Sequence, residues 1–165
     1  MPKTNRLASL LCAGLATMGV GLVPGARGTY GSVLTWALAL AWLGSGGAAL
    51  QGWGYVLLLA CLSALAVAVS HTVEKSRIFG GKADPAQIVI DEAVGMLIAL
   101  WGQAAPICWW RAGLALAAFR FFDIVKPWPV NAAQRLPGGW GVVADDVIAG
   151  LYALGLVALL GWLAA

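Results

Sequence analysis

Charge is what this sequence has least of. Charged residues make up 10% of the 165-residue chain and hydrophobic residues 61%, whereas soluble domains carry about 25% charged residues. This shortage excludes an ordinary soluble domain and predicts an integral membrane protein. We expect a single domain over residues 1–165, because a polytopic bundle of this length has no room for a second core.

Cysteines and clustered basic residues are also scarce. The three cysteines have no CxxC spacing and lie in or beside apolar runs, so we interpret them as small core residues rather than disulfides or metal ligands. The net charge of +3 is not gathered into one basic face, and we therefore expect no nucleic-acid partner. The sequence also lacks an internal repeat and a convincing cleavable signal peptide.

Long apolar runs are abundant, and each is too long and too apolar for a strand of a small protein. A helix needs about 20 residues to cross the hydrocarbon, which the third and last runs reach. The first run is rich in glycine and can be re-entrant. The sequence thus predicts an all-α, polytopic membrane bundle of about five to six apolar helices, over residues 7–23, 32–43, 53–73, 88–101, 107–125 and 142–163.

Five of the seven acidic residues lie at the edges of these apolar runs. A single Asp near the centre of a membrane helix costs about 3 kcal/mol, and ionisable groups in such segments usually mark an ion, proton or substrate site. A chain that keeps five of them is expected to use them together, and a divalent metal would neutralise the cluster. The five residues are Asp91, Glu92, Asp123, Asp145 and Asp146.

Short connections predict that these acids meet on one side of the membrane. Residues 44–52 and 103–106 each join two apolar runs into a hairpin, which leaves the acid-bearing ends together with the loop at residues 24–31. The positive-inside bias makes this face cytoplasmic, because only Arg111 lies opposite with certainty. The basic residues assigned to the acidic face are Arg27, Lys75, Arg77, Lys82, Lys126 and Arg135.

Basic and hydroxyl residues beside the acids favour phosphate chemistry. Arg120, Asp123 and Lys126 follow one another at intervals of three, which places them on one helix face. Mg²⁺ prefers carboxylate, water and phosphate ligands, while Arg and Lys bind phosphoryl oxygens. Thr29 and Ser32, in a glycine-rich loop before a helix, would complete a phosphate cradle.

Simpler interpretations of each residue stay open at this point. Asp123 can merely pair with Arg120, Asp145 and Asp146 can be ordinary acids of a first helical turn, and the glycine-rich loop can be a flexible turn. Glu92 can be a structural hydrogen-bonding partner for a neighbouring helix. Taken jointly, the five acids with Arg120 and Lys126 favour a functional site.

A series of sequence blocks occurs in order from residue 28 to residue 152. They are GTYGS at 28–32, DP at 84–85, IVIDE at 88–92, GM at 95–96, FRFFDIVKPWP at 119–129, and GG, G, DD and AG between 138 and 150. In these blocks, of which FRxFDxxKPWP and DDxxAG are specific, the chain resembles the phosphatidylglycerophosphatase A family. The family often has Pro before the GTxGS block, where this chain has Arg27; an added anion contact and a neutral replacement are both open.

This resemblance implies a Mg²⁺-dependent lipid phosphatase of the bacterial inner membrane, which is the cytoplasmic membrane. The substrate would be a phospholipid in that membrane, phosphatidylglycerophosphate, hydrolysed to phosphatidylglycerol and inorganic phosphate in phospholipid biosynthesis. The alternative from another class is a small proton- or cation-coupled transporter, which would spread its acids through the membrane depth. The sequence does not fix the oligomeric state.

Other phosphatase chemistries lack their residues in this chain. A cysteine phosphatase needs a Cys with an Arg six positions on, and a haloacid-dehalogenase phosphatase needs an Asp-x-Asp pair; neither occurs. The extended Asp-x-x-Asp-Gly series of CDP-alcohol phosphotransferases is also missing. Type 2 phosphatidic-acid phosphatases use two histidines, and His71 is the single histidine of this chain. Metal-assisted attack by water remains, with carboxylates as ligands and one as general base; an aspartyl-phosphate intermediate is the alternative. We interpret His71 as a polar residue at a helix end.

We therefore predict one shared site on the cytoplasmic face. The predicted metal ligands are Asp91, Glu92, Asp123 and Asp146, and Asp145 joins these four as the predicted catalytic carboxylates. The predicted substrate-binding residues are Thr29, Ser32, Arg120 and Lys126.

Overall fold

Helices make up all the regular structure of the residues that the computed structural model describes, which are 6–80 and 85–164. Lys82 and Asp84, which entered the predictions, lie outside these residues. The predicted all-α class is confirmed over the described part of the chain. The helices are α1 (Arg6–Thr17), α2 (Arg27–Gly44), α3 (Gly52–Ser76), α4 (Ile90–Ala99), α5 (Trp109–Val125), α6 (Val130–Ala133) and α7 (Gly139–Leu163), with a 3₁₀ turn, η1 (Val20–Leu22).

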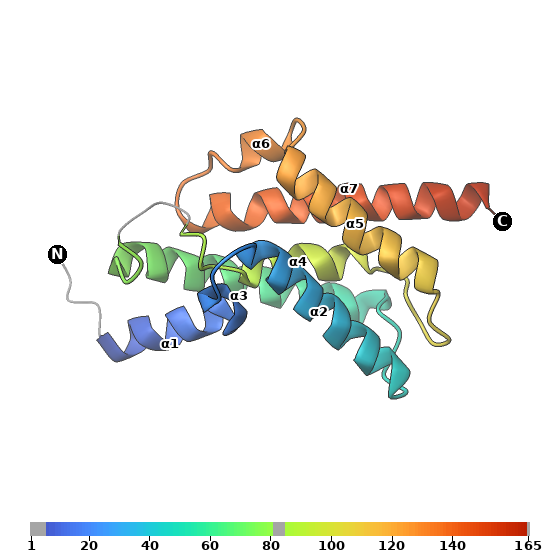
Figure 1. The fold of residues 1–165 in the computed structure, drawn as a ribbon, viewed down its shortest axis with the longest axis horizontal. Helices are drawn as coiled ribbons and strands as arrows, with labels where there is room; N and C mark the ends of the chain where they lie inside the picture. The colour runs from blue at the N-terminus through green and yellow to red at the C-terminus, as the bar shows by residue number, and fades with distance from the viewer. Residues whose placement is uncertain (1–5, 81–84, 165) are drawn as a thin grey trace.

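The short helix α4 forms the centre of the bundle. Eight of its ten residues are buried, and it packs against α7, α2, α3 and α5 (Figure 1). Small residues let these helices approach closely. A Cβ on Gly150 of α7 would lie 2.4 Å from the carbonyl oxygen of Gly95 in α4, and a Cβ on Gly95 would lie 2.4 Å from the ring of Phe119 in α5. These glycines fix α4, α5 and α7 relative to one another.

Two helices begin earlier than the sequence predicted. The α2 helix starts at Arg27, so residues 28–32 are its first turns and not the expected loop. The α7 helix starts at Gly139, so Asp145 and Asp146 lie in its second turn and not in its first. Close packing explains the second correction, because a Cβ on Gly139 would lie 2.2 Å from the carbonyl oxygen of Val67 in α3. Gly139 is needed at a helix contact, whereas the glycine-rich sequence around it suggests a loop.

The connections between α2 and α3 and between α4 and α5 meet at one end of the bundle. The backbone N–H of Leu50 donates to the carbonyl of Gln103 at 2.8 Å, and that of Gly102 donates to the carbonyl of Leu50 at 2.9 Å. Both connections lie at the right of Figure 1. The two helical hairpins are therefore joined to each other at their tips.

Among the described residues, two helices, α3 and α7, are long and apolar enough to cross a membrane, each with 25 residues. Large hydrophobic side chains such as Trp53, Leu57 and Trp162 are exposed on them, as expected for helices that face lipid. Length and composition support two spanning helices in the described part of the chain, so spanning by all of the five to six predicted apolar helices is not confirmed.

Candidate active site

A polar cavity of about 210 Å³ opens at the end of the bundle away from the joined hairpin tips. Its walls come from the start of α2, the start of α4, the end of α5 and the second turn of α7. All five predicted acids line it, together with three cations. The lining residues are Gly25, Arg27, Gly28, Ala86, Ile88, Asp91, Glu92, Arg120, Asp123, Lys126, Asp145 and Asp146.

The α4 helix contributes two carboxylates from its first turn, Asp91 and Glu92. The partial positive charge of the helix N-terminus stabilises anions there. Asp91 is buried and Glu92 is half-buried, and Glu92 Oε2 has no hydrogen-bond partner among the described residues. A buried carboxylate oxygen without a donor is costly, so this atom is suited to a ligand.

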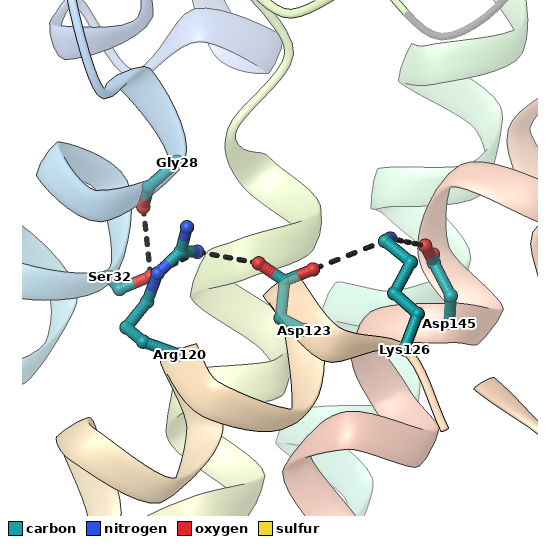
Figure 2. A network of polar contacts seen from close by, with 6 residues as sticks. All are labelled: Gly28, Ser32, Arg120, Asp123, Lys126 and Asp145. Carbon is teal, nitrogen blue, oxygen red and sulfur yellow. Dashed lines mark hydrogen bonds and ion pairs between the residues drawn. The ribbon is translucent and has the colours of Figure 1, made fainter. Parts of the chain in front are cut away.

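The end of α5 supplies a chain of alternating charges, shown in Figure 2. Arg120 Nη1 lies 2.8 Å from Asp123 Oδ2, and Lys126 Nζ lies 3.5 Å from Asp123 Oδ1. Lys126 also donates to Asp145 Oδ2 of α7. Lys126 ends the helix in the left-handed conformation, with φ 48°. Its side chain therefore bridges carboxylates of α5 and α7.

The charge state of Lys126 follows from these neighbours. Burial acts to lower its pKa, but the hydrogen bond to Asp145 and the nearby carboxylates of Asp145, Asp123 and Asp146 outweigh burial and raise the pKa above its ordinary value. Lys126 is therefore a permanent cation of the cavity at neutral pH.

The α7 helix places Asp145 and Asp146 against the other acids, each with 3% of its surface exposed. Asp146 belongs to two groups of three carboxylates, one with Asp91 and Glu92 and the other with Asp123 and Asp145. In each group one oxygen per residue lies within 4.8 Å of the others. Oxygen-only groups of this kind suit a hard divalent cation such as Mg²⁺.

The first turns of α2 complete the wall. Ser32 Oγ donates to the carbonyl of Gly28 at 2.8 Å and accepts a hydrogen bond from Arg120 Nη1 at 3.2 Å (Figure 2). A Cβ on Gly28 would lie 2.2 Å from Glu92 Oε1, so a side chain there would displace the carboxylate. Thr29 is half-buried and is not among the lining residues. Ser32 thus contacts the site through Arg120, whereas Thr29 lies outside the cavity wall and its binding of substrate stays a prediction.

Arg27 is absent from the predicted site residues but lines the cavity. The resemblance led us to expect Pro at this position, and the replacement by Arg was the signal that could have identified the residue.

His71 is not among the lining residues. Its Nδ1 lies 2.5 Å from where a Cβ on Gly138 would stand, beside the start of α7, as expected for a polar residue at a helix end.

Comparison with protein families decides the relationship that the sequence blocks suggested. The family model for phosphatidylglycerophosphatase A matches residues 15–161, which include every residue of the cavity wall. The chain belongs to the phosphatidylglycerophosphatase A family. This confirms the resemblance, and with it the prediction of a hydrolase that acts on phosphoric monoesters.

Curated relatives agree with this membership in the phosphatidylglycerophosphatase A family. The chain is 36% identical to phosphatidylglycerophosphatase A of Haemophilus influenzae over 82% of this chain and 79% of that protein. It is 30% identical to phosphatidylglycerophosphatase A of Escherichia coli over 92% of this chain and 82% of that protein.

A third relative matches a shorter part of the chain. A Bacteroides thetaiotaomicron protein, provisionally named a phosphatidylinositol-3-phosphatase, is 44% identical over 80 residues, which span 48% of this chain and half of that protein. No solved structure matches the chain significantly.

Proposed function

We propose that this protein hydrolyses phosphatidylglycerophosphate to phosphatidylglycerol and inorganic phosphate, by Mg²⁺-assisted attack of water. The observation that carries the proposal is the convergence of five carboxylates and three cations from four helices in one cavity. Acids alone would suit many ions, and cations alone would suit many anions. Both together suit a phosphate bound with a divalent metal.

The donor set fits Mg²⁺. Two oxygen triads share Asp146, and Glu92 Oε2 is buried without a donor among the described residues. We propose that the carboxylates of Asp91, Glu92, Asp123 and Asp146 hold the metal, with Asp145 held close by Lys126. When bound, the metal supplies positive charge against the charge that develops on the phosphoryl oxygens.

The protein's own cations orient the substrate phosphate in this proposal. Arg120 is held by Asp123 and Ser32, so its planar guanidinium is preorganised to bind phosphoryl oxygens in a fixed direction. Lys126 adds a point charge from the other side of Asp123. In this proposal water attacks phosphorus and one cavity carboxylate accepts its proton, while the bond from phosphorus to the glycerol oxygen breaks and that oxygen takes up a proton to become the hydroxyl of phosphatidylglycerol.

We further propose that the chain is a single multi-pass domain of the bacterial inner membrane with the cavity facing the cytoplasm. The two long apolar helices support membrane insertion. The positive-inside bias supports the orientation, since Arg27, Lys126 and Arg135 lie at the cavity end and Arg111 at the start of α5. The remaining apolar helices would be spanning or re-entrant in this arrangement.

A direct assay tests the proposed reaction. The purified protein in detergent micelles should release inorganic phosphate from phosphatidylglycerophosphate, should stop when EDTA is added, and should recover when Mg²⁺ is restored. Phosphatidylinositol 3-phosphate serves as the comparison substrate, because one relative's name includes it. Absence of phosphate release from phosphatidylglycerophosphate, or equal rates with and without EDTA, would contradict the proposal.

The placement of the acids also bears on the two alternatives. A transporter would need acids through the membrane depth, whereas the five acids of this proposal all line one cavity at one end. An aspartyl-phosphate intermediate would give covalently labelled protein when the substrate carries ³²P in the terminal phosphate and the reaction is quenched with acid. We expect no label on the protein.

A further inference from the structure

Arg27 is a cation of the cavity to which the proposed reaction assigns no task. Its side chain lines the wall, and it is half-buried. Its Nε is buried and has no hydrogen-bond partner among the described residues. A buried donor without an acceptor is destabilising. A bound ligand with an acceptor oxygen would remove that cost.

Arg120 Nε is likewise buried without a partner among the described residues, so the ion pairs are what distinguish the other two cations of the cavity from Arg27. Arg120 pairs with Asp123, and Lys126 pairs with both Asp123 and Asp145. No carboxylate of the described residues forms an ion pair with Arg27. The guanidinium of Arg27 is therefore not neutralised by an ion pair with the acids that surround the proposed metal, although Arg27 lines the same cavity.

The backbone at Arg27 is fixed by local packing. Gly25 has a positive φ of 115°, and a Cβ there would lie 2.8 Å from the Tyr30 hydroxyl, so the turn is packed against α2. The Arg27 N–H donates to the carbonyl of Gly25 at 3.0 Å. Arg27 is also the first residue of α2, where the positive end of the helix reinforces attraction for an anion.

The neighbouring residue links Arg27 to the proposed phosphate site. A Cβ on Gly28 would lie 3.2 Å from Arg120 Nη1 and 2.2 Å from Glu92 Oε1. Arg27 and Arg120 thus flank one stretch of the α2 wall, and an anion beside Arg27 would be separated from one beside Arg120 by a short distance along that wall.

We propose that Arg27 binds the phosphodiester of the lipid substrate while Arg120 and Lys126 hold the terminal phosphomonoester. This inference rests on the proposed function, because it assigns the second phosphate of the same substrate. A lipid that carries both groups, separated by one glycerol, satisfies all three cations of the cavity. Phosphatidic acid, which has the monoester alone, leaves Arg27 without an anion. Arg27 is therefore a specificity-determining residue.

Kinetics with two lipids test this assignment in the full-length protein. In mixed micelles, Arg27→Gln should raise KM for phosphatidylglycerophosphate roughly tenfold, the loss of one charge-assisted contact, with kcat within about twofold because the monoester site is intact. Phosphatidic acid, added as a competitor, should inhibit wild type and Arg27→Gln equally. The KM of Arg27→Lys for phosphatidylglycerophosphate should lie between the values of wild type and Arg27→Gln, since a point charge replaces the planar fork.

A matched control is Arg135→Ala, which removes an exposed cation at the same end of the molecule that does not line the cavity; its KM should match that of wild type. An unchanged KM in Arg27→Gln would overturn the inference. So would an equal loss of affinity for phosphatidic acid, which would make Arg27 part of the monoester site. In both cases wild-type turnover would leave the proposed function standing, whereas failure of the wild type to release phosphate would remove the proposed function itself.

Discussion

The side chains of the cavity are coupled, so the effect of a substitution depends on its neighbours as well as on its own charge. Asp123 contacts Arg120 on one side and Lys126 on the other. Lys126 in turn reaches Asp145, and Arg120 reaches Ser32. Neighbours in one network of this kind do not contribute additively. Removal of the Asp123 carboxylate would therefore leave both Arg120 and Lys126 without one of their partners.

Neutralisation of Asp146 should have the largest effect among the acids, because Asp146 belongs to both carboxylate triads. Asp146→Asn keeps the shape of the side chain and should lower kcat for phosphate release by at least about a hundredfold, since it removes a proposed metal ligand. Asp123→Asn should behave similarly.

The control for these variants is Glu74→Gln, the neutralisation of an acid on α3 that does not line the cavity. It should keep wild-type turnover. A monodisperse elution profile in detergent would show that the Asn variants are folded. Near wild-type phosphate release by Asp146→Asn would contradict the shared metal site.

Arg120→Lys should be damaging although the charge is kept. The Nη1 atom of Arg120 contacts both Asp123 and Ser32, and a lysine ammonium cannot reproduce the planar fork that orients a phosphate. We expect kcat/KM for the lipid to fall about tenfold or more. Unaltered kcat/KM would return Arg120 to a purely structural ion pair.

At the scale of the elements, glycine contacts control how the acid-bearing helices meet. The close approach of Gly150 to the backbone of Gly95 leaves no space for a side chain between α7 and α4. Asp91, Glu92, Asp145 and Asp146 lie within two turns of this contact. A wider spacing of the two helices would therefore separate the oxygens of both carboxylate triads.

Gly150→Val should lower the midpoint of thermal unfolding in detergent, because overpacking of this kind costs about 1–3 kcal/mol. It should also lower phosphate release. Gly155→Val is the matched control on the same helix, since a Cβ on Gly155 meets nothing within 4 Å. If both variants unfolded at the same temperature, the close contact would not determine stability.

The sequence predicted the convergence of the acids better than it predicted the helix starts. Asp123 and Asp146 were brought together correctly, because short connections between apolar runs leave few possible arrangements of their ends. The start of α2 was missed because glycine and hydroxyl residues usually indicate a loop. In the fold, Gly28 and Gly31 are instead glycines at contacts, where a Cβ would meet Glu92 and Val89.

Contacts across the bundle were also outside the reach of sequence reasoning. The i, i+3 spacing predicted the pairing of Arg120 with Asp123, which the structure has at 2.8 Å. The spacing could not predict that Lys126 reaches Asp145 on α7 or that Ser32 binds Arg120. These contacts depend on the crossing of helices that are distant in sequence, which no local pattern encodes.

At the scale of the whole molecule, the proposed orientation is tested by labelling. Single cysteines are introduced at two exposed positions, Ser45 in the connection between α2 and α3 and Arg135 in the connection between α6 and α7, after replacement of Cys12, Cys61 and Cys108. The two connections lie at opposite ends of the bundle (Figure 1). An impermeant maleimide added to intact cells should label position 45 and leave position 135 unlabelled. Labelling of position 135 from outside, with position 45 protected, would invert the orientation.

The joined hairpin tips bear on how such a chain enters a membrane. Residues 45–51 and 102–108 contain no charged side chain, and they hydrogen-bond to each other through Leu50, Gly102 and Gln103. In the proposed orientation these are the segments that must be carried across the bilayer. These two segments carry no ion that must lose its water, so Arg111 at the start of α5 is the charge that has to cross beside them. Their mutual bonds satisfy backbone groups that lipid cannot. Each hairpin can then insert as a unit, while every carboxylate of the cavity stays on the side where it was synthesised.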